Sequence, residues 1–232
     1  MCMIKSYKQL MKLYNVERYR ACATSAMRDA KNGVKILKKI RKETGIDIEI
    51  LNGSEEAKIL YNNSIESAES VSGNYAYVDV GGGSTEISLL SDGKLVGSCS
   101  YNIGTLRMLS GKVSQADIDE MTTDLSLYAN EIPDIRIIGS GGNINKLFKL
   151  THQKKDPKEI LVSEIKDMRD KLSKLSIEER IEQYGLKTDR ADVIIPAADI
   201  YVAAAEALGC DRIHVPNISL ADSIVDGLGT ER

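Results

Sequence analysis

The residues with the clearest chemical pattern lie at positions 77–87, in the run Tyr-Val-Asp-Val-Gly-Gly-Gly-Ser-Thr-Glu-Ile. Its apolar start predicts a strand that brings Asp79 to the edge of three consecutive glycines. Glycines let the backbone turn tightly and bring several N–H groups close to an anion. The candidate phosphate ligands are these glycines and the serine after them, Gly81, Gly82, Gly83 and Ser84. Asp79 and Glu86 could hold a divalent cation beside that anion, since hard cations prefer carboxylate oxygen.

Two common glycine-rich loops do not fit this run. A Walker loop needs a Gly-Lys-Ser/Thr sequence that opens a helix, and the run has no such lysine. A dinucleotide-binding loop also needs a following helix, whereas residues 86–90 look extended and lead to a turn signal at residues 91–94. The pattern therefore predicts strand, glycine loop, strand. The alternative is a tight glycine hairpin that binds no ligand.

The composition limits the classes of function. The chain has 232 residues, 42% hydrophobic and 28% charged, which is ordinary for a globular protein. Its net charge of −3 gives no basic field for nucleic acid, so we expect no nucleic-acid partner. No apolar stretch is long enough to span a membrane, so we expect no membrane partner either. Four widely spaced cysteines predict reduced, packed side chains and a cytoplasmic location.

Strands and helices alternate along the chain, which predicts α/β architecture. We expect a loop over residues 24–28 and a domain boundary in the polar segment 66–74. A helix is predicted to start after Asn52-Gly53 with Ser54 as its N-cap. Another is predicted to run without interruption over residues 191–208, and residues 151–158 read as a polar loop.

Four motifs now identify a family resemblance. They are Ala-Thr-Ser-Ala-Met-Arg (23–28), Asn-Gly-Ser-Glu-Glu-Ala (52–57), Val-Asp-Val-Gly-Gly-Gly-Ser-Thr-Glu (78–86) and Ile-Gly-Ser-Gly-Gly-Asn (138–143). Together they resemble the exopolyphosphatase and guanosine-pentaphosphate phosphohydrolase family of the actin-like ATPase superfamily, in the family's order. Residues 190–197, Arg-Ala-Asp-Val-Ile-Ile-Pro-Ala, look like a fifth motif.

The resemblance implies an actin-like (ribonuclease H-like) two-domain α/β fold with mixed sheets flanked by helices. Residues 1–68 would be the remnant of a truncated first domain and residues 69–232 the second domain. The last helix, 217–228, could pack back on the first domain. Family members carry an Asp-x-Gly-Ser/Thr-Asn loop upstream of the first motif, and the 22 residues before Ala23 do not resemble it. The resemblance thus implies that roughly 70 residues are missing from the first domain.

The resemblance also assigns roles to individual residues. Glu56 would be the carboxylate that positions or deprotonates the attacking water, with Glu55 as the alternative. Asp79 and Glu86 would ligate Mg²⁺ or Mn²⁺. Arg28 would pair with a phosphate. A second backbone site for phosphate would lie at a helix start formed by Ser140, Gly141 and Gly142.

The implied function is release of terminal phosphate from inorganic polyphosphate or guanosine pentaphosphate, with activity doubtful for a truncated chain. One alternative is an ATP-dependent kinase or ATPase of the same superfamily. Another is an inactive fragment that binds phosphate compounds or associates with itself. Missing strands would expose a sheet edge, so we expect a homo-oligomer, a dimer in the simplest case.

Overall fold

The computed structural model describes residues 1–52, 55, 59, 73–92, 94–151, 158–216 and 220–230. Its largest element is a six-stranded sheet with the strand order β5-β4-β3-β6-β8-β7. The strands are β3 (Asn74–Val80), β4 (Thr85–Ser91), β5 (Lys94–Tyr101), β6 (Ile135–Ser140), β7 (Glu159–Leu161) and β8 (Arg212–His214).

The sheet is mixed, and the connections explain why. Strands β3, β4 and β5 form an antiparallel meander because short turns join them. Strand β6 pairs with β3 in parallel, and β8 pairs with β6 in parallel. Parallel neighbours need long crossovers, and helices supply them here. Strand β7 closes the far edge as an antiparallel partner of β8.

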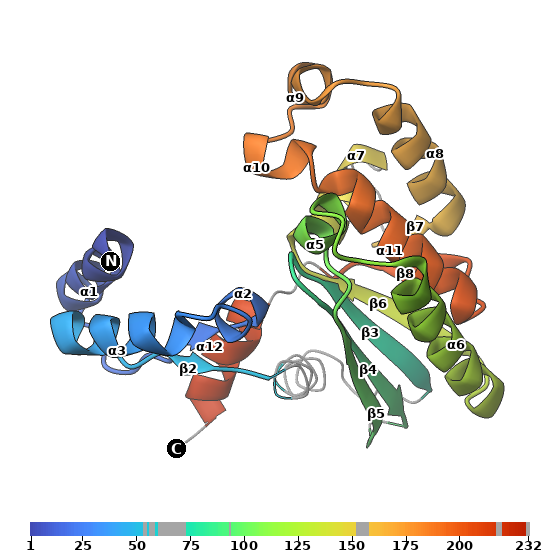
Figure 1. Cartoon of the computed structure of the whole chain (residues 1–232). Coiled ribbons are helices and arrows are strands. Elements are labelled where there is room, and N and C mark those ends of the chain that lie inside the picture. Colours follow the sequence, from blue (N-terminus) through green and yellow to red (C-terminus); the bar gives the residue numbers. More distant parts are fainter. Residues whose placement is uncertain are drawn as a thin grey trace.

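Helices cover this sheet on the side labelled α6, α11 and α8 in Figure 1. The helices of this part of the chain are α5 (Thr105–Leu109), α6 (Gln115–Glu131), α7 (Gly142–Thr151), α8 (Val162–Ser173), α9 (Ile177–Tyr184), α10 (Thr188–Ala191) and α11 (Ile194–Ala207). Helix α11 packs against α6, α7 and α8, and nine of its fourteen residues are buried. It is therefore the centre of the hydrophobic core, with Tyr201 fully buried.

The N-terminal part of the chain forms a separate layer, drawn in blue in Figure 1. It holds α1 (Cys2–Leu13), α2 (Ser25–Arg28), α3 (Gly33–Thr44) and a two-stranded parallel sheet of β1 (Cys22–Ala23) and β2 (Glu49–Ile50). Helix α3 is capped by Gly45, whose φ of 75° is in the left-handed region that glycine favours. Figure 1 draws α12 (Leu220–Thr230) in the same region of the view as α2, α3 and β2.

Three sequence predictions need correction. The loop expected at residues 24–28 contains the single helical turn α2, in which the N–H groups of Met27 and Arg28 bond to the carbonyl of Thr24. The helix expected over residues 191–208 begins only at Ile194, as α11, and is separated from α10, which ends at Ala191. Pro196 explains the break, because a continuous helix needs an N–H at this position and room for the ring beside the carbonyl of Asp192.

The third correction is an addition: strand β7, which completes the sheet edge, was not expected after the segment 151–158, and residues 152–157 of that segment lie outside the described residues. Ser54 lies outside the described residues. The same holds for residues 66–72 of the boundary expected at 66–74. Among the helices that the structure does describe, none has the length and apolarity that crossing a membrane would require.

Candidate functional site

The glycine run forms the predicted hairpin. The antiparallel register of β3 and β4 continues to the last pair, Val80 with Thr85, which leaves a loop of four residues. The N–H of Gly81 donates to the carbonyl of Ser84 at 2.9 Å and closes that loop. The sequence therefore predicts this element correctly in position and type.

Helix α5 holds the glycine loop from one side. The N–H groups of Thr105 and Leu106 donate to the carbonyls of Gly81 and Gly82 at 3.0 and 2.9 Å. Gly104, which precedes α5, lies so close that an added Cβ would be 2.5 Å from backbone atoms of the loop. Only glycine fits here, because any side chain at Gly104 would push the loop away.

Asp79 and Glu86 occupy paired positions on the two strands, so their side chains share one face of the hairpin. Glu86 is buried, and its Oε1 accepts hydrogen bonds from the hydroxyls of Ser84 at 2.6 Å and Ser100 at 3.3 Å. Burial raises the pKa of Glu86, and these hydroxyls oppose the shift. Burial and then the charge of Glu86 raise the pKa of Asp79 to about 6.

The predicted residues of the second glycine turn lie beside Asp79. Strand β6 ends at Ser140, and an added Cβ at Gly141 would lie 2.5 Å from Oδ1 of Asp79. Gly141 has a φ of 91°, which also favours glycine. The buried hydroxyl of Ser140 is close enough to lower the pKa of Asp79, yet it reaches full hydrogen-bond geometry with none of the described residues.

The carboxylate pair suits a hard cation. Asp79 and Glu86 supply oxygen donors of the kind that Mg²⁺ binds, and the Ser140 hydroxyl adds a buried oxygen without a full partner. Within the described residues no cluster of three His, Cys, Asp or Glu side chains occurs. The fit is therefore to a cation that keeps several waters or takes oxygens from a phosphate ligand, as Mg²⁺ does.

Arg28 ends α2 and faces the same site from the N-terminal layer. Its charge lowers the pKa of Glu86, although this is a smaller effect than burial and the two serine hydroxyls, and its Nη1 donates to the carbonyl of Leu51 at 2.7 Å. Arg107 of α5 links the two parts of the chain. It donates to the carbonyl of Gly83 at 2.8 Å and forms an ion pair with Asp29, next to Arg28.

A cavity of about 460 Å³ opens between the glycine loop and α10. Among its lining residues are Asp79, Gly81, Gly82 and Gly142 from the predicted site. Arg190 also lines it and was given no role from the sequence, although it begins the fifth motif. The guanidinium of Arg190 donates to Oδ1 of Asn143 at 2.8 Å and lies over Gly142, where an added Cβ would be 2.7 Å from Nη2.

Asn143 explains how Arg190 is tied to the glycine hairpin. Its Nδ2 donates to the carbonyl of Val80 at 3.1 Å, so the side chain joins the start of α7 to the end of β3. Asn143 and Arg190 are 47 positions apart, and no local pattern in the sequence would pair them. Only the tertiary fold, which places α10 beside the start of α7, brings the two side chains together.

The structure describes one of the two candidate catalytic glutamates, Glu55, but not Glu56. Glu55 makes a reciprocal pair with Asn52: its Oε2 accepts from the N–H of Asn52 at 2.8 Å, and its own N–H donates to Oδ1 of Asn52 at 2.9 Å. This is a capping-box arrangement, with Asn52 as the capping residue. The carboxylate of Glu55 is thus engaged at the helix start. Glu56 lies outside the described residues.

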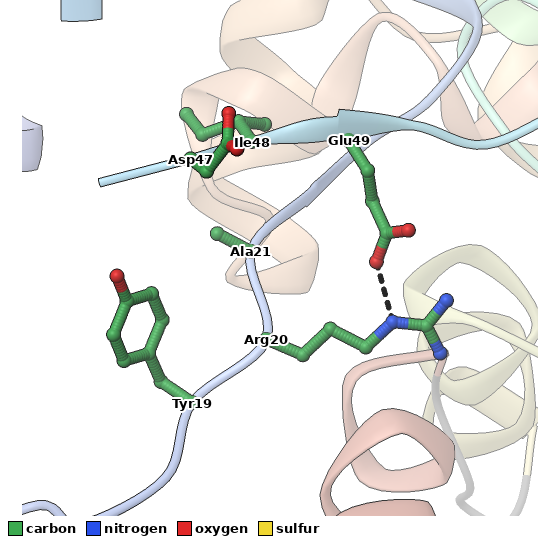
Figure 2. A pocket seen from close by; sticks show the side chains of 6 residues that line it. All are labelled: Tyr19, Arg20, Ala21, Asp47, Ile48 and Glu49. Carbon is green, nitrogen blue, oxygen red and sulfur yellow. Dashed lines mark hydrogen bonds and ion pairs between the residues drawn. The ribbon is translucent and has the colours of Figure 1, made fainter. Parts of the chain in front are cut away.

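A second cavity of about 400 Å³, shown in Figure 2, lies in the N-terminal layer and contains none of the predicted site residues. In it Arg20 forms an ion pair with Glu49, while Tyr19 points away from that pair. The neighbouring thiol of Cys22 donates to Glu49 at 3.3 Å. Burial, followed by this hydrogen bond, raises the pKa of Cys22 to about 11, so the thiol stays protonated at neutral pH.

Comparisons with known proteins identify relatives of this chain. A bifunctional 3-dehydroquinate synthase/phosphatase of Fusobacterium nucleatum is 29% identical over 248 residues, covering 97% of this chain and 37% of that protein. Exopolyphosphatase 1 of Mycobacterium leprae is 24% identical over 225 residues, covering 88% of this chain and 66% of that protein. The chain therefore spans less than two thirds of the length of these curated relatives.

Solved structures of related proteins identify the fold of this chain. The Aquifex aeolicus member of the Ppx/GppA family superimposes with a TM-score of 0.75 at 25% identity, covering 99% of this chain and 80% of that one. An exopolyphosphatase from Cytophaga hutchinsonii gives a TM-score of 0.82 at 21% identity, covering 97% and 79%, and this likeness concerns the fold. The predicted actin-like α/β class is confirmed. The model of the Ppx/GppA phosphatase family matches residues 1–230, and the chain therefore belongs to that family.

Proposed function

We propose that this chain carries the site of a phosphoanhydride hydrolase that releases terminal phosphate from inorganic polyphosphate or guanosine pentaphosphate. The observation that carries the proposal is the pairing of Asp79 with Glu86 at the end of a glycine hairpin, with Arg28 facing it. A buried carboxylate, Glu86, beside a partly buried one, Asp79, costs stability unless a ligand compensates the charges, so the pair favours a cation site.

The roles proposed for the residues follow from their chemistry. The N–H groups of Gly82 and Gly83 lie at the tip of the closed loop and would donate hydrogen bonds to phosphate oxygens. Arg28 would pair with a phosphate, because guanidinium offers two donors in a fixed geometry. Glu56 would hold a water in line with the terminal phosphorus. Mg²⁺ or Mn²⁺, held by Asp79 and Glu86, would neutralise the charge that develops on the transferred group.

Glu56→Gln in the full chain tests the proposal. We expect this variant to lose phosphate release from polyphosphate and from guanosine pentaphosphate, and to keep the binding of both, because the amide is isosteric but cannot act as a base. Glu55→Gln is the matched control. Its carboxylate accepts a hydrogen bond at a helix start, and the oxygen of glutamine can accept the same bond, so the variant should keep both its stability and its activity.

Each possible result has a clear meaning. Near-normal hydrolysis by Glu56→Gln would refute the role of Glu56. Faster release of phosphate from ATP than from either proposed substrate would favour the kinase or ATPase alternative. If the unmodified chain binds polyphosphate but hydrolyses none of the three, the phosphate-binding fragment is the better description.

Two further expectations from the sequence belong to this proposal. A cytoplasmic location agrees with four free cysteines. A dimer could form through strand β5, which is an edge of the large sheet and exposes Val96. A monomeric elution volume in size-exclusion chromatography at micromolar concentration would contradict the dimer.

A further inference from the structure

A strongly basic segment of the chain begins at Arg28, which belongs to the proposed site. Between residues 28 and 42 there are seven basic residues and one acidic residue, in a chain whose net charge is −3. Most of this segment is helix α3, which runs from Gly33 to Thr44. The local charge is therefore opposite in sign to the charge of the whole chain, and the segment should attract anions.

Four lysines of α3 lie on one face. At 100° per residue they fall within a sector of about 100°, and all four are exposed. They are Lys35, Lys38, Lys39 and Lys42, and we call them the lysine stripe. The buried residues Ile40 and Thr44 lie on the opposite face of the helix. Among the described residues, the only ion pair of the stripe joins Lys39 to Glu43, at 3.9 Å.

The stripe leads away from the proposed site. Figure 1 shows α2, which ends at Arg28, next to the end of α3 that is nearest the large sheet. Asp29, the next residue, is held by Arg107, which also holds the glycine loop. Helix α3 begins four residues after Asp29, and its twelve residues extend about 18 Å. Lys31, which is exposed, lies between Arg28 and the lysine stripe in the sequence.

We propose that the lysine stripe binds the part of a long polyphosphate chain that extends beyond the phosphates held at the glycine hairpin. This inference rests on the proposed function and adds a preference for long chains over short ones. A single exposed lysine–phosphate pair contributes little, but a row of cations along a linear polyanion gains from every pair and from the release of counterions.

The chemistry of α3 favours polyphosphate over nucleic acid. Proteins that bind single strands combine a basic groove with aromatic side chains that stack on bases. Helix α3 has no aromatic residue in its sequence, Gly-Val-Lys-Ile-Leu-Lys-Lys-Ile-Arg-Lys-Glu-Thr. Its basic face thus offers charge without a stacking surface, which suits a chain that consists of phosphate alone.

The test replaces all four lysines of the stripe with glutamine and compares the binding of long-chain polyphosphate and of tripolyphosphate. The stripe variant should bind long-chain polyphosphate roughly tenfold more weakly, with a shallower salt dependence. Its affinity for tripolyphosphate should stay unchanged, because a short chain reaches only the hairpin. The matched control makes the same change at four exposed lysines elsewhere, Lys94, Lys149, Lys171 and Lys174, and should keep both affinities.

Three results would overturn the inference. The first is unchanged long-chain binding by the stripe variant, and the second is an equal loss in the control variant, which would reduce the effect to net charge. The third is binding of single-stranded RNA as tight as that of polyphosphate with the same loss in the stripe variant. Failure of the unmodified chain to bind tripolyphosphate would instead contradict the proposed function.

Discussion

Asp79→Asn should make the metal-free protein more stable at neutral and alkaline pH, which is the opposite of the usual effect of changing a packed polar residue. In the folded state, burial and the neighbouring Glu86 raise the pKa of Asp79 from 3.8 to about 6. At neutral pH this carboxylate is therefore charged in a place that disfavours charge. Asparagine keeps the shape and removes the charge.

The size and sign of the effect follow from proton linkage. The folded state holds the proton of Asp79 more tightly than the unfolded chain does, so this group lowers the free energy of unfolding as the pH rises from about 4 to about 6. A shift of about two pKa units corresponds to about 3 kcal/mol. Asp79→Asn should thus be more stable than the unmodified protein by up to about 3 kcal/mol at pH 8 and by almost nothing at pH 4.

Urea unfolding in the presence of a chelator, repeated from pH 4 to pH 8, measures this difference. Asp167→Asn, at an exposed carboxylate of α8, is the matched control and should show a small difference that does not vary with pH. Added Mg²⁺ should remove most of the difference at pH 8, because a cation at one hundred times its dissociation constant stabilises only the protein that binds it, by about 2.7 kcal/mol. A variant that is less stable than the unmodified protein at pH 8, or a difference independent of pH, would refute the reasoning.

Two further substitutions test the supports of the site. Gly104→Ala should lower stability by about 1–3 kcal/mol and weaken phosphate binding, since its Cβ would lie 2.5 Å from loop backbone atoms. Thermal unfolding and calorimetric titration measure this, and Gly227→Ala, with no heavy atom within 4 Å of the added carbon, should not destabilise. Tyr201→Phe removes the donor to the buried carbonyl of Ser140 and should cost about 1–2 kcal/mol in urea unfolding. Unchanged stability of either site variant would contradict the packing described here.

The glycine hairpin was predictable because the sequence signals that specify it are close together in the chain. Alternating apolar residues, consecutive glycines and a turn signal all fall within about 25 residues, and β3, β4 and β5 form where they predict. The approach of Gly141 to Asp79 was partly predictable, since parallel strands end at the same sheet edge. What the pattern could not give is the distance between them or the pKa that results from burial.

The features that sequence reasoning missed depend on contacts distant in the sequence. Arg107 reaches Asp29 across 78 residues, and Arg190 reaches Asn143 across 47, with no periodic signal at either end. The turn α2 is too short to produce helical periodicity. The break before α11 could have been read from Pro196, but the apolar run around it hid the signal.

The tight register of the hairpin has a consequence for binding affinity. Strands β3 and β4 stay paired up to Val80 and Thr85, and α5 fixes two carbonyls of the loop between them. A flexible loop would lose about 1–2 kcal/mol of conformational entropy per residue on closing around a ligand. Here folding has already ordered these residues, so an anion that reaches the loop keeps nearly all of the free energy of its contacts.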